Sequence, residues 1–377
     1  MKKTIVSILS ITCILNSCGP KHAKTDTQQE AFLSEGKYYP MTSNVVNYIE
    51  DSLPKVEWFT LKKIDIPDKY KKPLCYMYHD SIMLIVNNKN PSPYMLTVMD
   101  CKTKEIVAEY FEYGNKRRNF SAMSVLQRKN YFNLFDYKKR VVSRLCLDSV
   151  IAKRNGYNPQ WTSYTSLNNF DFDYTNDSVI TWVNPQYVKG FWEDSIPSFV
   201  QTNTLGRSLT NYSQNEDVTS CAHWRTFAIN GAHYMEFWKS FPIINIYSKN
   251  FELEKQYRDT KFKDTELLLE DNMVMEKGVA LYCFEFGCQT DKYVLVNNFR
   301  SSMEFEGYVS LGGDPAFGKF HEIWFFDTNC NLVRRMRCKN LKGQVMGLSY
   351  CDESGSLYMN VIDEKNDIAF YRCIFEK

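Results

Sequence analysis

The stretch FDFDYTND, residues 170–177, brings three carboxylates close together: Asp171, Asp173 and Asp177. Closely spaced carboxylate oxygens are the ligands that Ca²⁺ prefers. The stretch lacks the glycine and the terminal glutamate of an EF-hand loop, and alternating phenylalanine and aspartate is also typical of a half-buried strand. We therefore predict a strand with its phenylalanines inward and its carboxylates in water, and we assign no metal and no cofactor.

The histidines show no catalytic or metal-binding spacing. His79, His223, His233 and His321 lie outside the polar N-terminal segment, and none belongs to an HExxH motif. His223 and His233 flank the stretch HWRTFAINGAH and could approach each other across a turn, but a surface or packing role is the simpler interpretation. The sequence also lacks a GxSxG nucleophile elbow and a GKS or GKT phosphate loop. We assign no catalytic residue.

Tryptophans gather in one part of the chain. Five of the seven lie between residues 161 and 238: Trp161, Trp182, Trp192, Trp224 and Trp238. Trp182 and Trp238 occur in strand-like runs, where packing is the expected role. Trp192, with Phe191 beside it, stands between a glycine and a proline, which indicates a loop. Because exposed aromatic rings can bind sugars or protein surfaces, we predict that Phe191 and Trp192 contribute to binding a saccharide or a partner protein.

The first 17 residues have the pattern of a secretion signal. Two lysines precede the apolar run TIVSILSITCIL, which is too short to span a bilayer. The run ends in LNSC, residues 15–18, which resembles the lipobox of bacterial lipoproteins. The resemblance implies cleavage before Cys18 and acylation of its thiol, so that Cys18 attaches the protein to a membrane. The alternative is an ordinary secretory signal with a nearby free cysteine.

The residues after Cys18 indicate a tether. Residues 19–36 are polar and have almost no apolar periodicity, so this segment cannot bury enough surface to order itself. Gly19 follows the cysteine, whereas aspartate at that position is common in lipoproteins that stay in the inner membrane. An acidic surface-export cluster is also missing. The resemblance therefore implies the outer membrane, with the periplasmic face favoured over the cell surface.

Composition argues against a nucleic-acid partner and for a β-rich fold. The chain has 46 basic and 44 acidic residues, and removal of the signal takes two lysines, so the mature chain is formally neutral. A nucleic-acid-binding protein would normally show a basic excess. The aromatic content of 15%, with 25 Tyr and 25 Phe, favours strands, because aromatic side chains suit a half-buried pleated surface.

The spacing of the cysteines does not define a disulfide framework. Of the 12 cysteines, Cys13 lies in the signal and Cys18 at its end, which leaves ten in the rest of the chain. An even number in an oxidising compartment is compatible with disulfides. No CxxC occurs, so a structural zinc site has little support. Most of these cysteines lie in apolar runs, where a buried small hydrophobic residue is the expected role.

The strands expected to position the residues discussed above follow a repeated sequence pattern. Each copy has an apolar run, an Asp or Ser, a few polar residues and a second alternating run; the copies span residues 94–110, 131–147, 242–258, 321–337 and 357–373, with a degenerate copy at 198–212. This pattern predicts a hairpin in which a short side chain bonds to the turn backbone. The turn residues are Asp100, Asp136, Ser248, Asp327 and Asp363.

A second strand pair precedes several of these hairpins, at residues 74–88, 121–135, 223–238 and 344–361. Four strands per repeat at a period near 40 residues is typical of a β-propeller blade. We predict an all-β, six-bladed β-propeller, with seven blades as the alternative if residues 249–320 contain a further unit. Residues 56–66 lack a hairpin partner and could supply the outermost strand of the last blade. Residues 264–278 are compatible with a helix or a strand.

The lipobox, the polar tether and the repeats around LFDYKKRVVSRLCLD and FFDTNCNLVRRM together resemble the TolB-like six-bladed propeller lipoproteins of Bacteroides-type bacteria. The resemblance covers about residue 54 to the C-terminus. It implies a fold and a compartment, and it offers no catalytic residues because the family is largely uncharacterised.

We therefore expect a signal at residues 1–17, a lipidated cysteine and tether at 18–53, and a propeller domain at 54–377. The leading interpretation is a non-catalytic binding or scaffold lipoprotein for an envelope protein or a saccharide. The alternative is a hydrolase or lyase that processes an envelope component or a polysaccharide. Such an enzyme would need convergent carboxylates, and the sequence spacing does not select a pair.

Overall fold

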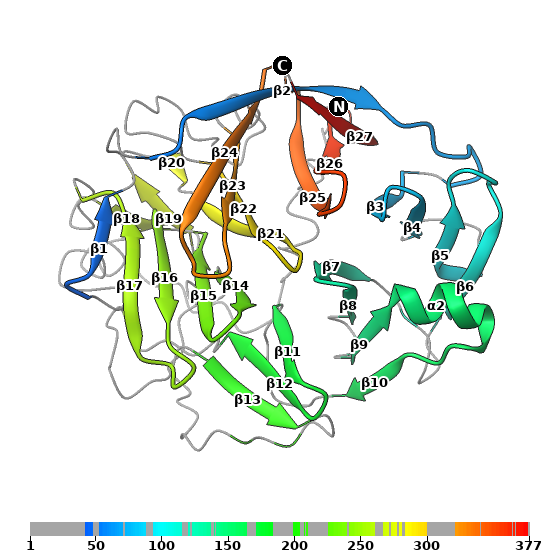
Figure 1. The fold of residues 1–377 in the computed structure, drawn as a ribbon, viewed down its shortest axis with the longest axis horizontal. Helices are drawn as coiled ribbons and strands as arrows, with labels where there is room; N and C mark the ends of the chain where they lie inside the picture. The colour runs from blue at the N-terminus through cyan, green and yellow to red at the C-terminus, as the bar shows by residue number, and fades with distance from the viewer. Residues whose placement is uncertain are drawn as a thin grey trace.

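The computed structural model folds most of its described residues into strands (Figure 1). The described residues are 42–47, 53–70, 72–87, 93–114, 120, 123–136, 139, 141–163, 171–183, 199–203, 207, 209, 225–239, 241–260, 267–270, 273–276, 279–280, 283–299, 321–339, 341–363, 365 and 367–375. The predictions for residues 1–17, for Cys18, and for Phe191 and Trp192 lie outside these residues.

Strands that follow one another in sequence pair antiparallel and form successive units. The first unit contains β3 (Leu74–Tyr78), β4 (Ile82–Val86), β5 (Tyr94–Asp100) and β6 (Ile106–Glu112). The second contains β7 (Ser124–Arg128), β8 (Tyr131–Asp136), β9 (Val141–Cys146) and β10 (Gln160–Ser163). The third contains β11 (Phe172–Asn176), β12 (Val179–Val183) and β13 (Phe199–Asn203).

The remaining units follow the same rule. The fourth contains β14 (Arg225–Asn230), β15 (His233–Trp238), β16 (Ile243–Tyr247) and β17 (Leu253–Arg258). The fifth contains β21 (Phe284–Gln289), β22 (Val294–Asn298), β23 (Glu322–Phe326) and β24 (Leu332–Cys338). The sixth contains β25 (Gln344–Cys351), β26 (Ser356–Ile362) and β27 (Ile368–Phe375). The hairpins predicted from the five clear repeats are thus confirmed.

The predicted turn residues are confirmed as well. The carboxylates of Asp100, Asp136, Asp327 and Asp363 and the hydroxyl of Ser248 each accept hydrogen bonds from backbone N–H groups two to four residues further along the chain. Each short side chain therefore satisfies N–H groups that the strand pairing leaves free. At Asp100 these backbone donors also lower the pKa of the carboxyl.

Strand β2 (Val56–Lys63), near the N-terminal end of the described residues, pairs with the last strand of the chain, as predicted for residues 56–66. It pairs antiparallel with the C-terminal strand β27, with Phe59 opposite Phe375 and Lys63 opposite Tyr371. Its first half also pairs in parallel with β24, which the sequence pattern did not predict. Figure 1 shows β2, in blue, lying across both units. The short strand β1 (Val45–Asn47) pairs in parallel with β17, so strand pairing begins before residue 54.

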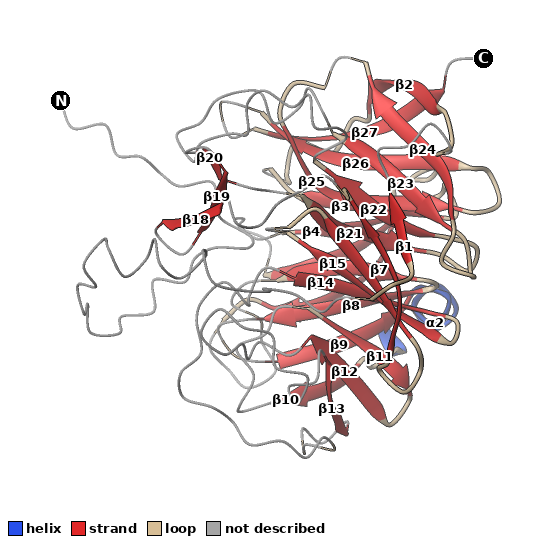
Figure 2. Cartoon of the chain, turned by 90° about the vertical axis from the view of Figure 1, so that its left-hand side faces the viewer, coloured by secondary structure: helices blue, strands red, loops and turns tan. Residues whose placement is uncertain are grey.

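The core lies in layers between successive units. A hydrophobic cluster fills each interface, from the first and second units through to the fifth and sixth. A further cluster, which includes Cys75, Met83, Cys351 and Phe370, packs the sixth unit against the first. The units accordingly stand around a common centre in a propeller-like arrangement (Figures 1 and 2).

The elements outside this arrangement are short. The helix α2 (Leu147–Lys153) and the 3-10 turn η1 (Arg154–Gly156) follow β9. Strands β18 (Leu267–Glu270), β19 (Met273–Glu276) and β20 (Val279–Ala280) form a separate sheet (Figure 2), so the ambiguous segment 264–278 contains strands. Among the described residues, no helix has the length and apolar character needed to cross a membrane.

We expect Phe59→Ala to lower the free energy of unfolding by about 3–5 kcal/mol, the usual cost of truncating a core phenylalanine. The Phe59 side chain is fully buried in the cluster between the fifth and sixth units. Thr60→Ala is the matched control on the same strand, because Thr60 is exposed on the opposite face. Chemical denaturation would measure both variants. Equal losses in the two would contradict a closing role for β2.

Candidate functional site

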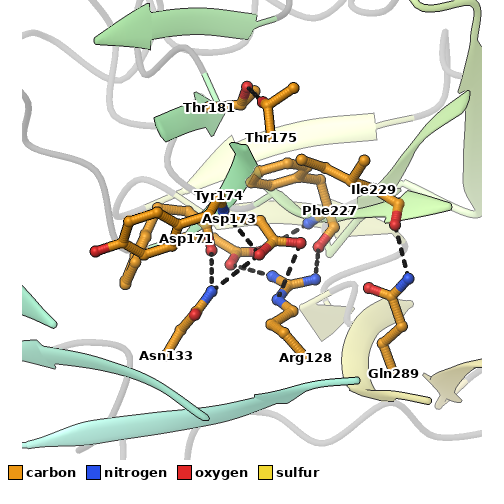
Figure 3. Close-up of polar contacts among 11 residues, drawn as sticks. Arg128, Asn133, Asp171, Asp173, Tyr174, Thr175, Thr181, Phe227, Ile229 and Gln289 are labelled. Atoms are coloured by element: carbon orange, nitrogen blue, oxygen red, sulfur yellow. Dashed lines mark hydrogen bonds and ion pairs between the residues drawn. The ribbon is translucent and has the colours of Figure 1, made fainter. Parts of the chain in front are cut away.

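Arg128, at the end of β7 in the second unit, is a buried arginine that contacts residues of three other units (Figure 3). Its side chain is 3% exposed, and its Nη2 donates a 2.7 Å hydrogen bond to Asp171 Oδ1, just before β11. Its Nη1 donates to the carbonyl of Phe227 in β14 at 2.5 Å. Its guanidinium carbon lies 3.6 Å from the centroid of the Phe286 ring in β21. One cation therefore connects the second, third, fourth and fifth units.

A backbone pairing between the second and fifth units helps to fix the position of Arg128. Arg128 pairs in parallel with Gln289 of β21, and the N–H of Lys129 donates to the Gln289 carbonyl at 2.7 Å. The Gln289 side chain in turn donates from Nε2 to the carbonyl of Ile229 in β14 at 2.6 Å. The second and fifth units, which are not neighbours in the chain, thus meet at the centre.

Two aspartates compensate this buried charge. Asp171 uses both oxygens, because Oδ2 also accepts from the N–H of Phe227 at 2.6 Å. Burial raises the pKa of Asp171 to about 6, although Arg128 and the Phe227 N–H act in the opposite direction. Asp173 Oδ2 lies 4.0 Å from Arg128 Nε, and its Oδ1 accepts from Asn133 Nδ2 at 3.1 Å. A buried arginine is tolerated only with such partners.

The prediction for the stretch 170–177 is therefore partly wrong. The strand is present as β11, and Phe172 is buried as expected. Asp171 and Asp173, however, are buried and not in water, because β11 is the first strand of its unit and is covered at the centre by Arg128 and Asn133. Asp177 is 96% exposed and lies 3.6 Å from Arg144. Asp171 and Asp173 face Arg128, whereas Asp177 faces Arg144, so the three carboxylates do not form one ligand set.

Uncharged side chains form hydrogen bonds with the backbone of other first strands. The inner edge of each unit, defined as the edge of its first strand that lacks a strand partner within that unit, carries backbone groups that need hydrogen bonds. Asn360 accepts from the N–H of Cys75 at 2.8 Å and donates to its carbonyl at 2.7 Å. Gln127 makes the equivalent pair of 3.3 Å contacts with Tyr350.

Single hydrogen bonds complete this set. Each joins a side chain of one unit to the inner edge of another: Ser349 accepts from the Met77 N–H, Tyr76 donates to the Val125 carbonyl, Asn133 donates to the Phe172 carbonyl, and Thr226 accepts from the Phe286 N–H. Polar side chains at the centre thus bind the units to one another and leave the strand edges satisfied.

The described histidines have local partners. His321 is buried 2.9 Å from Asn297, and burial lowers its pKa to about 3. His79 lies 3.2 Å from Glu353, and His233 lies 3.4 Å from Glu254. His223, the proposed neighbour of His233, lies outside the described residues.

Two further predictions concern packing. Trp182 and Trp238 are fully buried, which confirms the packing role assigned to them. Of the nine cysteines in the described ranges, all are free thiols and seven are buried, in agreement with their expected role as small core residues. Cys221 lies outside these ranges.

The Arg128 cluster was not predicted from the sequence. Arg128 ends an apolar strand in SVLQRKN and precedes a turn, where arginine normally reaches solvent. The nearest signal was the pair Asp171 and Asp173, which are unusual in a strand that must be buried. In the part of the chain that the structure describes, no group of three His, Cys, Asp or Glu side chains is arranged to hold a metal ion. The charged groups of the cluster instead face one another and the backbone.

Comparison with known proteins gives neither a family nor a curated relative, since no family model and no curated protein matches. A Bacteroides fragilis protein of known structure is 12% identical, with a TM-score of 0.46 over 88% of this chain and 99% of that one. A DUF4221 member from Bacteroides vulgatus is 9% identical, with a TM-score of 0.47 over 85% and 97%. A streptogramin B lyase is 11% identical, with a TM-score of 0.45 over 84% and 98%. With TM-scores below 0.5, these likenesses carry no conclusion about this chain.

We expect Arg128→Ala and Asp171→Ala each to lower the free energy of unfolding by about 3–5 kcal/mol, because each leaves an uncompensated buried charge. The double variant should lose less than the sum, by about 0.5–3 kcal/mol. Asp177→Ala is the matched control and should cost at most about 1 kcal/mol, since its ion pair is exposed. Urea denaturation of the four variants provides the measurement. Strict additivity would show that the two groups do not stabilise each other.

Proposed function

We propose that this chain is an outer-membrane lipoprotein whose six-bladed propeller acts as a non-catalytic binding scaffold for a partner protein or a saccharide. The observation that carries the proposal is the centre of the molecule: its buried charged and amide side chains are engaged in joining the units through Arg128, Asp171, Gln127 and Asn360. A rigid support of this kind suits recognition by the loops that it holds.

The six-bladed count is supported by the order of strand pairing. Each antiparallel unit would be one blade, and β2 would complete the sixth as its outermost strand. The hydrophobic cluster between the sixth unit and the first supports closure of the ring. The separate β18–β20 sheet has strands of four, four and two residues, which favours an insertion over a seventh blade.

The anchoring part of the proposal rests on the sequence. Residues 1–17 would be the signal, residues 18–53 the lipidated cysteine and tether, and residues 54–377 the propeller. The resemblance to TolB-like propeller lipoproteins supports the same division, and the residues after Cys18 support the periplasmic face of the outer membrane. On this arrangement the propeller would remain at the membrane while its loops bind.

The binding part of the proposal assigns Phe191 and Trp192 to the ligand surface. They lie between β12 and β13 in sequence, in the long connection of the third unit. Long connections on a rigid scaffold are where binding residues concentrate, and aromatic side chains contribute large contact areas to saccharide and protein ligands.

Cys18→Ala tests the anchor. We expect this variant to leave the membrane fraction or to remain unprocessed, because the lipobox resemblance implies cleavage before Cys18 and acylation of its thiol, and alanine has no thiol to acylate. Fractionation and intact-mass analysis of the two proteins provide the measurement. Unchanged membrane association, together with a wild-type mass that lacks a lipid, would refute lipid attachment at Cys18.

Trp192→Ala tests the binding surface. We expect it to abolish or weaken retention of the protein's saccharide or envelope-protein ligand, identified by glycan array and crosslinking, and to change the free energy of unfolding by at most about 0.5 kcal/mol. Trp182→Ala is the matched control: it removes a fully buried indole and should cost about 3–5 kcal/mol. A comparable loss of stability in Trp192→Ala would assign Trp192 to packing.

A further inference from the structure

The outward face of β2 forms a continuous surface with the two strands beside it. Phe59 points into the core between the fifth and sixth units, so Trp58, Thr60 and Lys62 occupy the opposite face of the strand. Trp58 pairs with Arg337 of β24, and Thr60 pairs with Ile374 of β27. Figure 1 shows β2 at the outer edge of the ring, so this face looks away from the centre.

Large apolar side chains are exposed on this surface. Trp58 is 40% exposed, Val333 in β24 is 43% exposed, and Ile374 is 40% exposed. The described residues contain seven exposed large hydrophobic side chains in all. The strand register places Trp58 and Ile374 on one face, and Val333 lies at a register shift in the neighbouring strand β24. Such a concentration marks an interaction surface more often than single exposed residues do.

Cationic side chains surround these apolar groups. Lys62 and Arg372 are opposite each other on β2 and β27 and are both exposed. Arg335 and Arg337 lie on the same face of β24, and the guanidinium of Arg337 stands 5.6 Å from the centroid of the Trp58 ring. We call these four cations, together with Trp58, Val333 and Ile374, the rim patch.

The charge of the rim patch is only partly compensated. Glu322 accepts from Arg337 at 2.5 Å and lies 3.6 Å from Arg335, and its carboxylate is buried. Glu57, the nearest exposed carboxylate on β2, lies on the other face of the strand and pairs with Arg334. Arg372 also interacts electrostatically with Asp80. Among the described residues, the four cations thus face two carboxylates, Glu322 and Asp80, which leaves the rim patch with a net positive charge beside an exposed indole.

We propose that the rim patch docks on an anionic phospholipid surface. Tryptophan favours the headgroup level of a bilayer, and lysine and arginine near it are attracted by anionic lipids. Three adjacent strands of one sheet, β24, β2 and β27, present these groups. The proposal rests on the proposed function in one respect: acylated Cys18 would hold the rim patch near a membrane. The roughly 26 residues between Cys18 and β1, the first strand that pairs with the units, could span roughly 85 Å when extended, so the tether permits this contact.

Vesicle binding by the chain from residue 18 onward with Cys18→Ser tests the proposal without any contribution from a lipid anchor. We expect sedimentation with vesicles of phosphatidylcholine mixed with phosphatidylglycerol, little sedimentation with phosphatidylcholine alone, and release at high salt. Thr60→Glu combined with Lys62→Glu should lower the partition coefficient at least tenfold, and Trp58→Ala should lower it severalfold. Both sites are exposed, and unchanged melting temperatures would verify that each variant is folded.

Lys102→Glu combined with Thr103→Glu is the matched control, because it makes the same substitutions in the exposed turn after β5. It should bind like the parent chain. Absence of binding to the anionic vesicles, equal binding to both vesicle types, or an equal loss in the control variant would overturn the proposal. Binding to a soluble polyanion such as heparin, without binding to vesicles, would also overturn it and assign the rim patch to an acidic polymer. Failure of the Cys18→Ala test would leave this result unaffected, so the two proposals fail separately.

Discussion

The structure depends on how the inner edges of its units are satisfied. The first strand of each unit has a strand partner from its own unit on one side only. Apart from the single Arg128–Gln289 pairing between β7 and β21, its other edge faces a buried centre, where a lost hydrogen bond costs about 1–3 kcal/mol. Side chains from other units fill this role. Asn360 and Gln127 each pair with both backbone groups of one residue, and Arg128 and Asp171 do the same for Phe227. The interactions that satisfy the edges therefore also hold the units together.

This requirement explains why charged residues at the centre do not indicate catalysis by themselves. Arg128 is buried and joins four units, and a buried cation needs its carboxylates wherever it lies. The raised pKa of Asp171 follows from burial, and perturbed pKa values occur in structural ion pairs as well as in active sites. Under the proposed function, recognition would fall to the connections between strands and to the outer rim.

At the rim, closure and exposure are linked. β2 must cover two units at once, so Phe59 points inward and Trp58 points outward. A single strand thereby stabilises the interface between the fifth and sixth units and displays an aromatic side chain among cations.

The sequence by itself determined the local features. The apolar runs and the aspartates at 100, 136, 327 and 363 predicted hairpins because a turn side chain bonds to backbone only a few residues away. It also predicted that β2 would pair with the last hairpin, since a strand without a local partner needs a remote one. Only the tertiary structure determined that Arg128 is buried and that Asp171 and Asp173 are buried beside it. Their partners are 43 and 45 residues away in the chain, and spacing within one strand carries no information about which distant strand will lie opposite.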